Sequence, residues 1–403
     1  MNFFRKAQEA FQTILRPIGL PEPPSNDPRH HNNDETPQIV EEKPVLTVAQ
    51  RLRLKKERID NALLNSEVFT DDEFREICFE GVPPNSDSHR GTLWLPLLLI
   101  DLPRSYADWK QYFSDKKDLY NEFVRDFYHG RPTIARDPLG ESPEWDEYYK
   151  DQDIKFEIAK DVVRTHRGLH FFNIGIDAEG LEMHTPSDEI FKVLNACEHH
   201  AALHRILFVL SKVNPALQYV QGMNELSALI YYVLYNSTSH LKTLDIEFHA
   251  ESAAFWAMNS LLSDIGGLFS TQMDQTEAGM RGAFRKYRKL MRKVDPEMDD
   301  HFRSICLEEE FYLLSWITLF FTQLFSLPDV IPLWDFFLSE KNSTSRLNRV
   351  LIFAVSIFEL EREKYLSMNL SEILTDVQEV KAAPNEILKH AKALVKEFFP
   401  NTV

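Results

Sequence analysis

The feature that most constrains this chain is a long run of uncharged residues in its C-terminal half. The segment FYLLSWITLFFTQLFSLP, residues 311–328, contains 18 residues without a charge. A run of this length either crosses a membrane or lies inside a protein core. Polar residues interrupt it, and the acidic residues 308–310 and Asp329 flank it with no adjacent Lys or Arg to anchor an interface. The sequence therefore predicts a central buried helix rather than a membrane span.

The composition supports a globular, helical protein. Hydrophobic residues make up 43% of the 403 residues and charged residues 27%, and the 13 glycines are too few for many tight hairpins. The net charge of −17 argues against broad binding to nucleic acid, which needs a basic surface. The simplest explanation of the acidity is solubility.

Cysteine usage and the start of the chain bear on the compartment. The three cysteines, Cys78, Cys197 and Cys306, lie far apart and show no metal-ligand spacing. Neither a disulfide framework nor a zinc site is expected, which fits a reducing compartment. The first residues, MNFFRKAQEAFQTIL, carry charges within their apolar stretch and do not form a secretory signal. We therefore expect a cytoplasmic protein.

Composition divides the chain into three parts. Residues 1–20 have apolar anchors for a short helix, which either frays or docks on a protein or membrane surface. Residues 21–46 are rich in Pro, Asn, Asp and Glu, which is typical of a disordered linker. Residues 47–403 are expected to form one large domain with a loop inserted around 129–150, and a further loop is expected at 173–187.

From residue 47 onward apolar residues recur at helical spacing. Thr70 with Glu73 three residues later is a capping-box signature, and Gly81 marks the end of that helix. The other segments with helical periodicity are 47–64, 188–215, 223–235, 250–269, 277–294, 346–366 and 384–399. Few segments alternate with period two, so the predicted fold class is all-α.

The common catalytic motifs are absent. No GxxxxGK[ST], GxGxxG, GxSxG or HExxH sequence occurs, so nothing indicates a bound nucleotide, an activated serine or a catalytic metal. His30–His31 lies in the predicted linker, and His199–His200 is expected on an exposed helix face. Neither pair has a third ligand nearby, so no metal site is expected.

Two arginines, Arg164 and Arg167, follow Asp161 in the segment EIAKDVVRTHRG, residues 157–168. Helical periodicity places Asp161 at the edge of the apolar face, between that face and Arg164. An Asp and an Arg three residues apart can pair. Taken alone this is a modest surface ion pair, and the spacing does not decide which arginine matters.

A second segment, NPALQYVQGMNELSALIYYVL, breaks one helix at Asn214–Pro215 and begins another near Met223. Gly222 permits a tight backbone and close approach by a ligand. Gln221 is displayed at the helix entry, and its amide can hold a water molecule and a phosphate oxygen together. In a third segment, HRGTLWLPLLL, Trp94 is expected in the core and Arg90 is expected to anchor a loop.

In this order, the three segments resemble the pattern of the TBC-domain family, whose members activate Rab-type small GTPases. The family pattern R-x-x-x-W corresponds to Arg90–Trp94, I-x-x-D-x-x-R to Ile158–Arg164, and Y-x-Q-G to Tyr219–Gly222. The later segment SWITLFFTQLFSLPDVIPLWDFF resembles the tryptophan helix and W-D-x-F segment of the family. The resemblance covers residues 74–400. Each motif alone is weak, whereas the ordered set is specific.

The resemblance implies a fold and a mechanism. The fold is a large multi-helix domain of two helical subdomains. Arg164 is the arginine finger, and Gln221 is the glutamine finger that orients the attacking water in a partner Rab GTPase in its GTP form. The implied supporting residues are Asp161, which would orient Arg164, and Arg90, Trp94, Tyr219, Gly222 and Asn224. The chain itself needs no cofactor and turns over no substrate of its own, because GTP and Mg²⁺ belong to the partner.

Two positions depart from the family pattern. Pro332 stands where the family commonly has an arginine, and Gln218 stands where glycine often precedes the tyrosine. Both changes affect local helix geometry rather than the two finger residues. A non-catalytic scaffold or Rab-binding effector is the alternative function, although such a protein has no need of both Arg164 and Gln221.

The basic segment at 281–293 contains seven Lys and Arg residues. A solvated helix face is the simplest interpretation. Contact with phosphoinositide membranes or docking of the GTPase are the alternatives. Peripheral recruitment of a cytoplasmic protein to membranes therefore remains open at this point.

Overall fold

The computed structural model describes residues 47–64, 69–131, 143–166, 169–172, 187–270, 273–340 and 346–400. The chain divides into two compact units, Met1–Arg51 and Leu52–Val403. Of the first unit only residues 47–51 are described, at the start of helix α2 (Val48–Leu64). The helix predicted at 1–20 and the linker predicted at 21–46 lie outside the described residues, as does the loop predicted at 173–187 except for its last residue.

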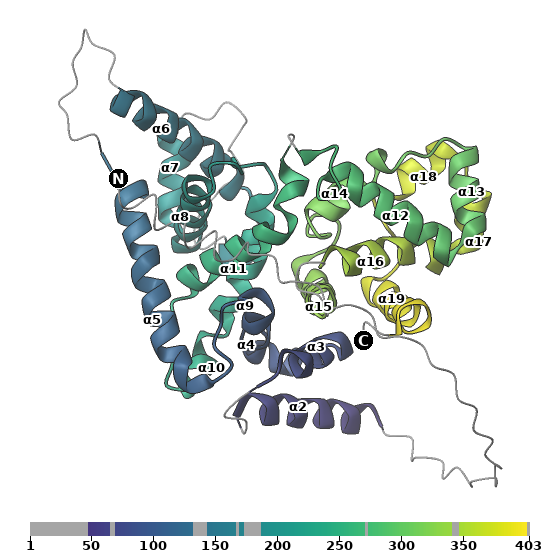
Figure 1. Cartoon of the computed structure of the whole chain (residues 1–403), viewed down its shortest axis with the longest axis horizontal. Helices are drawn as coiled ribbons and strands as arrows, with labels where there is room; N and C mark the ends of the chain where they lie inside the picture. The colour runs from purple at the N-terminus through teal and green to yellow at the C-terminus, as the bar shows by residue number, and fades with distance from the viewer. Residues whose placement is uncertain are drawn as a thin grey trace, which may run out of the picture. The chain divides into compact units, whose positions relative to one another are not determined.

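The regular elements of the described residues are all helices, which confirms the predicted all-α class (Figure 1). The earlier helices are α3 (Asp71–Glu80), α4 (Asp87–Leu98), α5 (Tyr106–Phe123), α6 (Pro143–Val162), α7 (Ser187–Ala196), α8 (Glu198–Val213), α9 (Met223–Asn236), α10 (Thr238–Thr243) and α11 (Ala250–Ile265). The later helices are α12 (Met280–Val294), α13 (Pro296–Ser304), α14 (Leu313–Thr318), α15 (Leu327–Leu338), α16 (Leu347–Leu360), α17 (Arg362–Ser367), α18 (Leu370–Asp376) and α19 (Pro384–Phe398).

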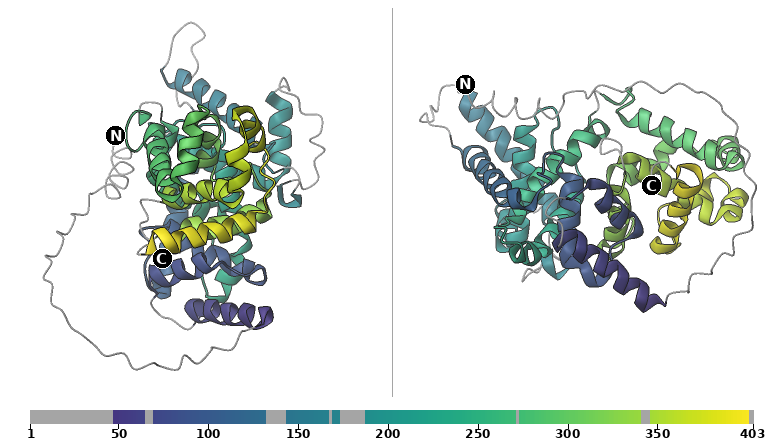
Figure 2. Two further views of the ribbon diagram at one scale, coloured as in Figure 1. Left: turned by 90° about the vertical axis from the view of Figure 1, so that its right-hand side faces the viewer. Right: turned by 60° about the horizontal axis from the view of Figure 1, so that its bottom comes forward.

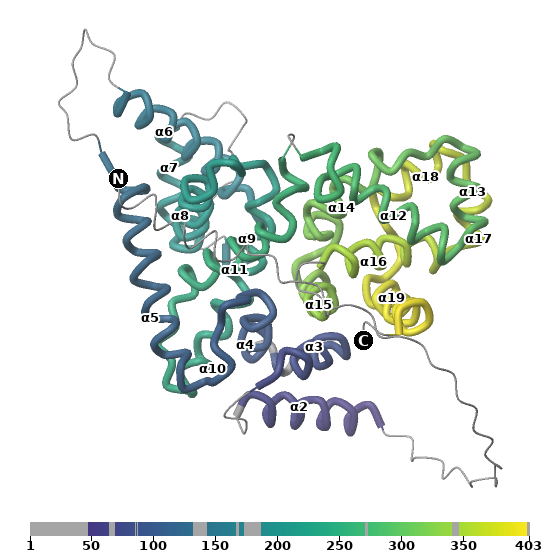
Figure 3. The backbone as a smooth tube through the Cα atoms, viewed as in Figure 1, coloured from purple at the N-terminus to yellow at the C-terminus, as the bar shows by residue number. Residues whose placement is uncertain are grey.

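Within the second unit the helices gather around two centres. Helix α9 packs against α4, α8 and α11, while α16 packs against α12, α14 and α19. The backbone passes from the first group to the second after α11, and the later helices lie together in the right-hand view of Figure 2 (Figures 2 and 3). Helix α15 contacts α3 and α4 as well as α16 and α19, so it joins the two groups.

Local signals at helix ends are confirmed at α3. The backbone N–H of Glu73 donates a hydrogen bond of 3.4 Å to Oγ1 of Thr70, which caps the helix. Gly81 ends the helix with φ of 95°, a conformation that a residue with a side chain rarely adopts. The helix therefore begins and ends where its sequence signals predict.

One boundary differs from the sequence prediction. Helix α6 begins at Pro143, so the loop predicted around 129–150 is too long at its C-terminal end. Proline at the first helical position explains this start, because its missing N–H has no partner within a helix in any case. The sequence allows the helical segment at 188–215 to be one helix or two, and it forms two, α7 and α8, which separate at Cys197 in an extended conformation.

The uncharged segment 311–328 is not one helix. It contains the short helix α14, then a turn in which Phe320 and Phe321 have φ values of 46° and 63°, and then the start of α15. The two phenylalanines are buried, and their side chains pack into the core from this turn. The predicted burial is correct for most apolar residues of the segment. The prediction that the segment forms one continuous helix is wrong. None of the described helices is both long and apolar enough to cross a bilayer.

The prediction that His199 and His200 face solvent is wrong. The two side chains are only 3% and 4% exposed. The imidazole of His199 stacks on the ring of Phe171, with centroids 3.7 Å apart, and its Nδ1 lies 3.1 Å from the hydroxyl of Tyr231. Helix α8 packs against α6, α7 and α9, so even its polar positions contact other helices.

Candidate functional site

The first loop of the candidate site begins where α6 ends. Ile158, Val162 and Thr165 are buried, as the helical periodicity predicts, whereas Arg164 is half-buried. The backbone N–H groups of Arg164 and Thr165 bond to the carbonyls three residues earlier, at 3.0 and 3.1 Å. This tighter winding ends the helix and displays Arg164 at its terminus. Arg167, the other arginine of the segment, lies outside the described residues.

The second loop connects α8 to α9 and carries Gln221. Gly222 has φ of 104° and precedes the first residue of α9. A side chain at Gly222 would clash with Leu319, which follows α14, so this position needs glycine for both its conformation and its space. The backbone N–H of Gly222 donates to Oδ1 of Asn224 at 2.9 Å. The loop is thereby held at the entry of the helix with Gln221 exposed.

A closed ring of hydrogen bonds joins the two loops. The hydroxyl of Tyr219 donates to Oδ2 of Asp161 at 2.7 Å and lies 3.4 Å from Oδ1 of Asn224. Nδ2 of Asn224 donates to Oγ1 of Thr165 at 2.8 Å, and that hydroxyl donates to the backbone carbonyl of Asp161 at 3.0 Å. Each ring member lies within three residues of Arg164 or Gln221, so the ring fixes the backbone of both.

The side chains of Arg164 and Gln221 themselves remain unbonded. Within the described part of the chain, neither makes a hydrogen bond or an ion pair. The direct pairing between Asp161 and Arg164 that the sequence allows is replaced by the bond from Tyr219 to Asp161. Burial raises the pKa of the Asp161 carboxyl. The hydrogen bond from Tyr219 and the charge of Arg164 both lower it, so Arg164 still acts on Asp161 through its charge.

Burial shifts the pKa of two further groups in this region towards the uncharged form. Burial and the nearby charge of Asp161 raise the pKa of Glu225, in the first turn of α9, from 4.5 to about 7. Burial lowers the pKa of His166, at the end of the first loop, from 6.5 to about 4. Nε2 of His166 lies 3.3 Å from Oε2 of Glu225, so the first loop contacts the first turn of α9 through these two side chains.

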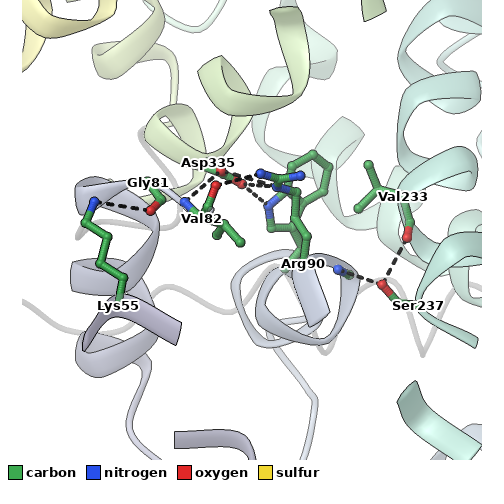
Figure 4. Close-up of polar contacts among 9 residues, drawn as sticks. Lys55, Gly81, Val82, Arg90, Val233, Ser237 and Asp335 are labelled. Atoms are coloured by element: carbon green, nitrogen blue, oxygen red, sulfur yellow. Dashed lines mark hydrogen bonds and ion pairs between the residues drawn. The ribbon is translucent and has the colours of Figure 1, made fainter. Parts of the chain in front are cut away.

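Arg90 and Trp94 of α4 bind a different carboxylate. Nε of Arg90 lies 3.1 Å from Oδ1 of Asp335, and Nε1 of Trp94 donates to the same oxygen at 2.8 Å (Figure 4). The backbone N–H of Val82 donates to Oδ2 of Asp335, and the guanidinium of Arg90 also donates to the carbonyl of Val82. Asp335 is fully buried on α15. This cluster therefore attaches α4 to α15, so Arg90 and Trp94 stabilise the fold.

Sequence reasoning gave Thr165 no role in the site beyond a place on the buried face. Its hydroxyl receives the hydrogen bond of Asn224 and so completes the ring. The available signal was its place on the buried face of α6, since a buried hydroxyl needs a partner. Leu319, which contacts Gly222, gave no such signal, because only the packing of α14 brings it there.

Comparison with known proteins identifies the family of this chain. The family model of the Rab-GTPase-TBC domain matches residues 87–366. The chain therefore belongs to the TBC-domain family, as the ordered motifs predict.

Individual relatives support the assignment over most of the chain. Human TBC1 domain family member 13 is 26% identical over 354 residues, which covers 73% of this chain and 86% of the relative. The yeast GTPase-activating protein GYP1, from Saccharomyces cerevisiae, is 22% identical over 300 residues, which covers 70% of this chain and 39% of GYP1. The crystal structure of the Ypt/Rab-GAP domain of Gyp1p has the same fold, with a TM-score of 0.65 and 16% identity over 86% of this chain and 99% of that domain.

Proposed function

We propose that this protein accelerates GTP hydrolysis by a Rab-family small GTPase and thereby regulates vesicle trafficking. Arg164 and Gln221 enter the active site of the partner in its GTP form, which supplies the nucleotide and the Mg²⁺ ion. The observation that carries this proposal is the ring of hydrogen bonds that fixes the backbone of both loops while both side chains stay unbonded. Polar side chains held on a fixed backbone without internal bonds stay available to a partner's phosphate and water.

The chemistry of hydrolysis explains the choice of these two residues. Negative charge on the transferred phosphoryl group must be stabilised in the transition state, and catalysis is mainly positioning and electrostatics. Arg164 would provide a planar cation with several donors for these oxygens. Gln221 would orient the attacking water, because its amide both donates and accepts hydrogen bonds.

The ring reduces the cost of bringing the two residues into a foreign active site. A loop that orders only upon binding loses conformational freedom at that moment, which weakens binding. Here Tyr219, Asn224 and Thr165 hold the backbone before the partner arrives. Asp161 therefore supports Arg164 through its bond to Tyr219 and through charge, rather than by holding the guanidinium directly.

The decisive experiment measures phosphate release from a panel of GTP-loaded Rab GTPases. Arg164→Ala and Gln221→Ala are each expected to lose most of the stimulation, since an arginine finger contributes about 10³–10⁵ in rate, or roughly 4–7 kcal/mol. Arg164→Lys is expected to fail as well, because lysine lacks the planar fork. Arg53→Ala, which removes an exposed arginine on α2, is the matched control and should act like the parent.

The panel also separates the activator from a non-catalytic effector on the same fold. If Arg164→Ala and Arg164→Lys both stimulate hydrolysis like the parent on every responsive GTPase, the finger mechanism is wrong. If the parent binds GTP-loaded Rab proteins without stimulating any of them, the protein is an effector or scaffold. Unchanged thermal unfolding of the variants excludes misfolding as the cause of lost activity.

A further inference from the structure

Helix α12 carries seven basic residues that the structure divides into two kinds. Its four arginines are all paired with carboxylates on neighbouring segments. The pairs are Arg281 with Glu310 at 3.6 Å, Arg285 with Glu277 at 2.7 Å, Arg288 with Glu309 at 2.5 Å, and Arg292 with Asp299 at 3.2 Å. These arginines therefore serve the fold, and their charges are largely neutralised where they lie.

The three lysines of α12 form a separate stripe. Lys286, Lys289 and Lys293 are spaced by three and four residues, so they share one face of the helix, and all three are exposed. In the described residues none of them lies within ion-pair distance of a carboxylate. Lys293 instead donates to the carbonyl of Phe398 at 3.0 Å and lies over the ring of Phe399. In a chain of net charge −17, the positive charge of this stripe is therefore not offset by a paired carboxylate among the described residues.

A cavity of about 280 Å³ lies beside the lysine stripe, between α12, α16 and the end of the chain that the structure describes. Besides the three lysines and Asn348, it is lined by Leu290, Leu351, Ile352, Phe399 and Glu340. Leu351 and Ile352 are buried and form part of its wall. Glu340, the one carboxylate in this lining, is itself buried and lies 3.5 Å from Arg349. The cavity thus combines a recessed apolar interior with a cationic rim.

This combination favours a protein segment over a membrane. A surface that binds bilayers by insertion projects apolar side chains outward into the lipid. Here Leu351 and Ile352 are recessed, so the occupant must supply the projecting group. A peptide with an apolar anchor and flanking acidic residues does this, since grooves of this kind take apolar anchors of a partner and a charged rim selects the partner by complementarity.

We propose that this cavity binds an acidic segment of a partner protein. One apolar side chain of the segment enters between α12 and α16, and its carboxylates face Lys286, Lys289 and Lys293. The site uses neither Arg164 nor Gln221, so it does not depend on GTPase activation. A partner bound in this cavity could hold the protein in place while the two loops that carry Arg164 and Gln221 bind a GTPase.

The test begins with a library of random peptides displayed on phage and selected against the full chain. The peptides recovered should combine an apolar residue with several Asp or Glu residues. A synthetic copy of the most enriched peptide is then measured by fluorescence anisotropy. Lys286→Glu/Lys289→Glu should weaken its binding by at least about tenfold, and added salt should weaken binding to the parent.

The matched control is Lys242→Glu/Lys381→Glu, which reverses two exposed lysines outside the cavity and should bind like the parent. A second variant, Leu290→Gln, removes apolar lining and should also weaken binding while thermal unfolding is unchanged. Selection of peptides without acidic residues, or equal binding to the parent and the Lys286→Glu/Lys289→Glu variant, would overturn the proposal. Binding of the parent to phosphatidylserine-containing vesicles but not to any selected peptide would overturn it in favour of a membrane contact.

Discussion

At the scale of single residues, some side chains of the candidate site hold its backbone, and others are left without internal bonds. Asp161, Tyr219, Asn224 and Thr165 use their polar groups on one another, whereas the side chain of Arg164 bonds to nothing in the described residues. An arginine left unbonded on a fixed backbone needs no internal bond to break before it enters a partner, so the cost is mainly that of immobilising its side chain, about 0.5–1.5 kcal/mol. The ring therefore allows direct tests of positioning.

Tyr219→Phe removes the hydroxyl that bonds to Asp161. A hydrogen bond to a charged group contributes about 1.5–3 kcal/mol, and its loss leaves Asp161 half-buried without this donor. We expect a lower maximal rate of GTP hydrolysis with little change in the protein concentration that gives half-maximal stimulation, because Arg164 itself is retained. Tyr232→Phe on α9 is the control, since the hydroxyl of Tyr232 makes no hydrogen bond in the described residues. Equal losses in both variants would argue against a positioning role.

Glu225→Gln tests the pH dependence of the same region. The pKa of Glu225 rises from 4.5 to about 7 in the folded protein, so between these pH values the folded state holds a proton that the unfolded state has lost. Stability from this group therefore decreases as the pH rises from about 4.5 to about 7. Glutamine has no proton to lose, so the variant should gain stability over the parent between pH 5 and pH 8, by at most about 3 kcal/mol.

Thermal unfolding at the two pH values measures this difference. Glu122→Gln, which changes an exposed glutamate on α5, should differ from the parent equally at pH 5 and pH 8. His166 acts in the opposite direction, because its pKa is lowered to about 4 and its contribution is lost as the pH falls from about 6.5 towards 4. A Glu225→Gln variant with the same pH profile as the parent would contradict the burial argument.

At the scale of elements, the segment around α14 exposes two large apolar side chains. Phe311, in the turn before α14, is 62% exposed, and Leu314 on α14 is 46% exposed. Leu319, just after the helix, lies against Gly222 beside Gln221, so the same segment reaches the candidate site. Exposed apolar residues of this kind are typical of a surface that a partner covers. Helix α14 is therefore expected to contribute to binding of the GTPase rather than to the chemical step.

Phe311→Ser/Leu314→Ser should weaken the apparent affinity for the GTPase while leaving the maximal rate close to that of the parent. Loss of two apolar anchors of this kind costs about 1–3 kcal/mol, or roughly tenfold to a hundredfold in affinity. Titration of phosphate release against protein concentration separates the two quantities. Ile100→Ser, which alters a residue 47% exposed elsewhere, is the control. A fall in maximal rate alone would place the defect in the chemistry instead.

At the scale of the whole molecule, Asp335 links α15, which joins the two groups of helices, to α4. It is fully buried on α15 and binds Arg90 and Trp94 of α4. Burial raises the pKa of Asp335 while the charge of Arg90 lowers it, so the pair depends on both partners being present. The supporting role expected for Arg90 and Trp94 would then be exerted through the fold.

Asp335→Ala leaves the buried guanidinium of Arg90 without its carboxylate. Removing one partner of a buried ion pair costs about 3–5 kcal/mol, so a marked fall in the midpoint of urea or thermal unfolding is expected. Glu247→Ala removes an exposed carboxylate that pairs with Lys117 and should leave the midpoint close to that of the parent. If both variants unfold like the parent, the cluster around Asp335 does not hold α4 to α15.

Local patterns in the sequence specify the helical class and most helix positions. Apolar spacing sets the buried face of α6, and capping residues set the ends of α3. Arg164 and Gln221 are candidates because the ordered motifs resemble the TBC-domain family, whose model matches this chain. Gly222 was also predictable, because a tight entry to α9 needs a residue without a side chain.

How these pieces meet depends on tertiary packing. Packing buries His199 between helices, bends the uncharged segment at Phe320 and Phe321, and joins Tyr219 to Asp161 across 58 positions of sequence. It also pairs the arginines of α12 with carboxylates, whereas the lysines have no ion-pair partner among the described residues, although both residue types are cationic. The physical reason is that local spacing sets which face of a helix is apolar, whereas hydrogen-bond and ion-pair partners depend on which distant segments pack against that face.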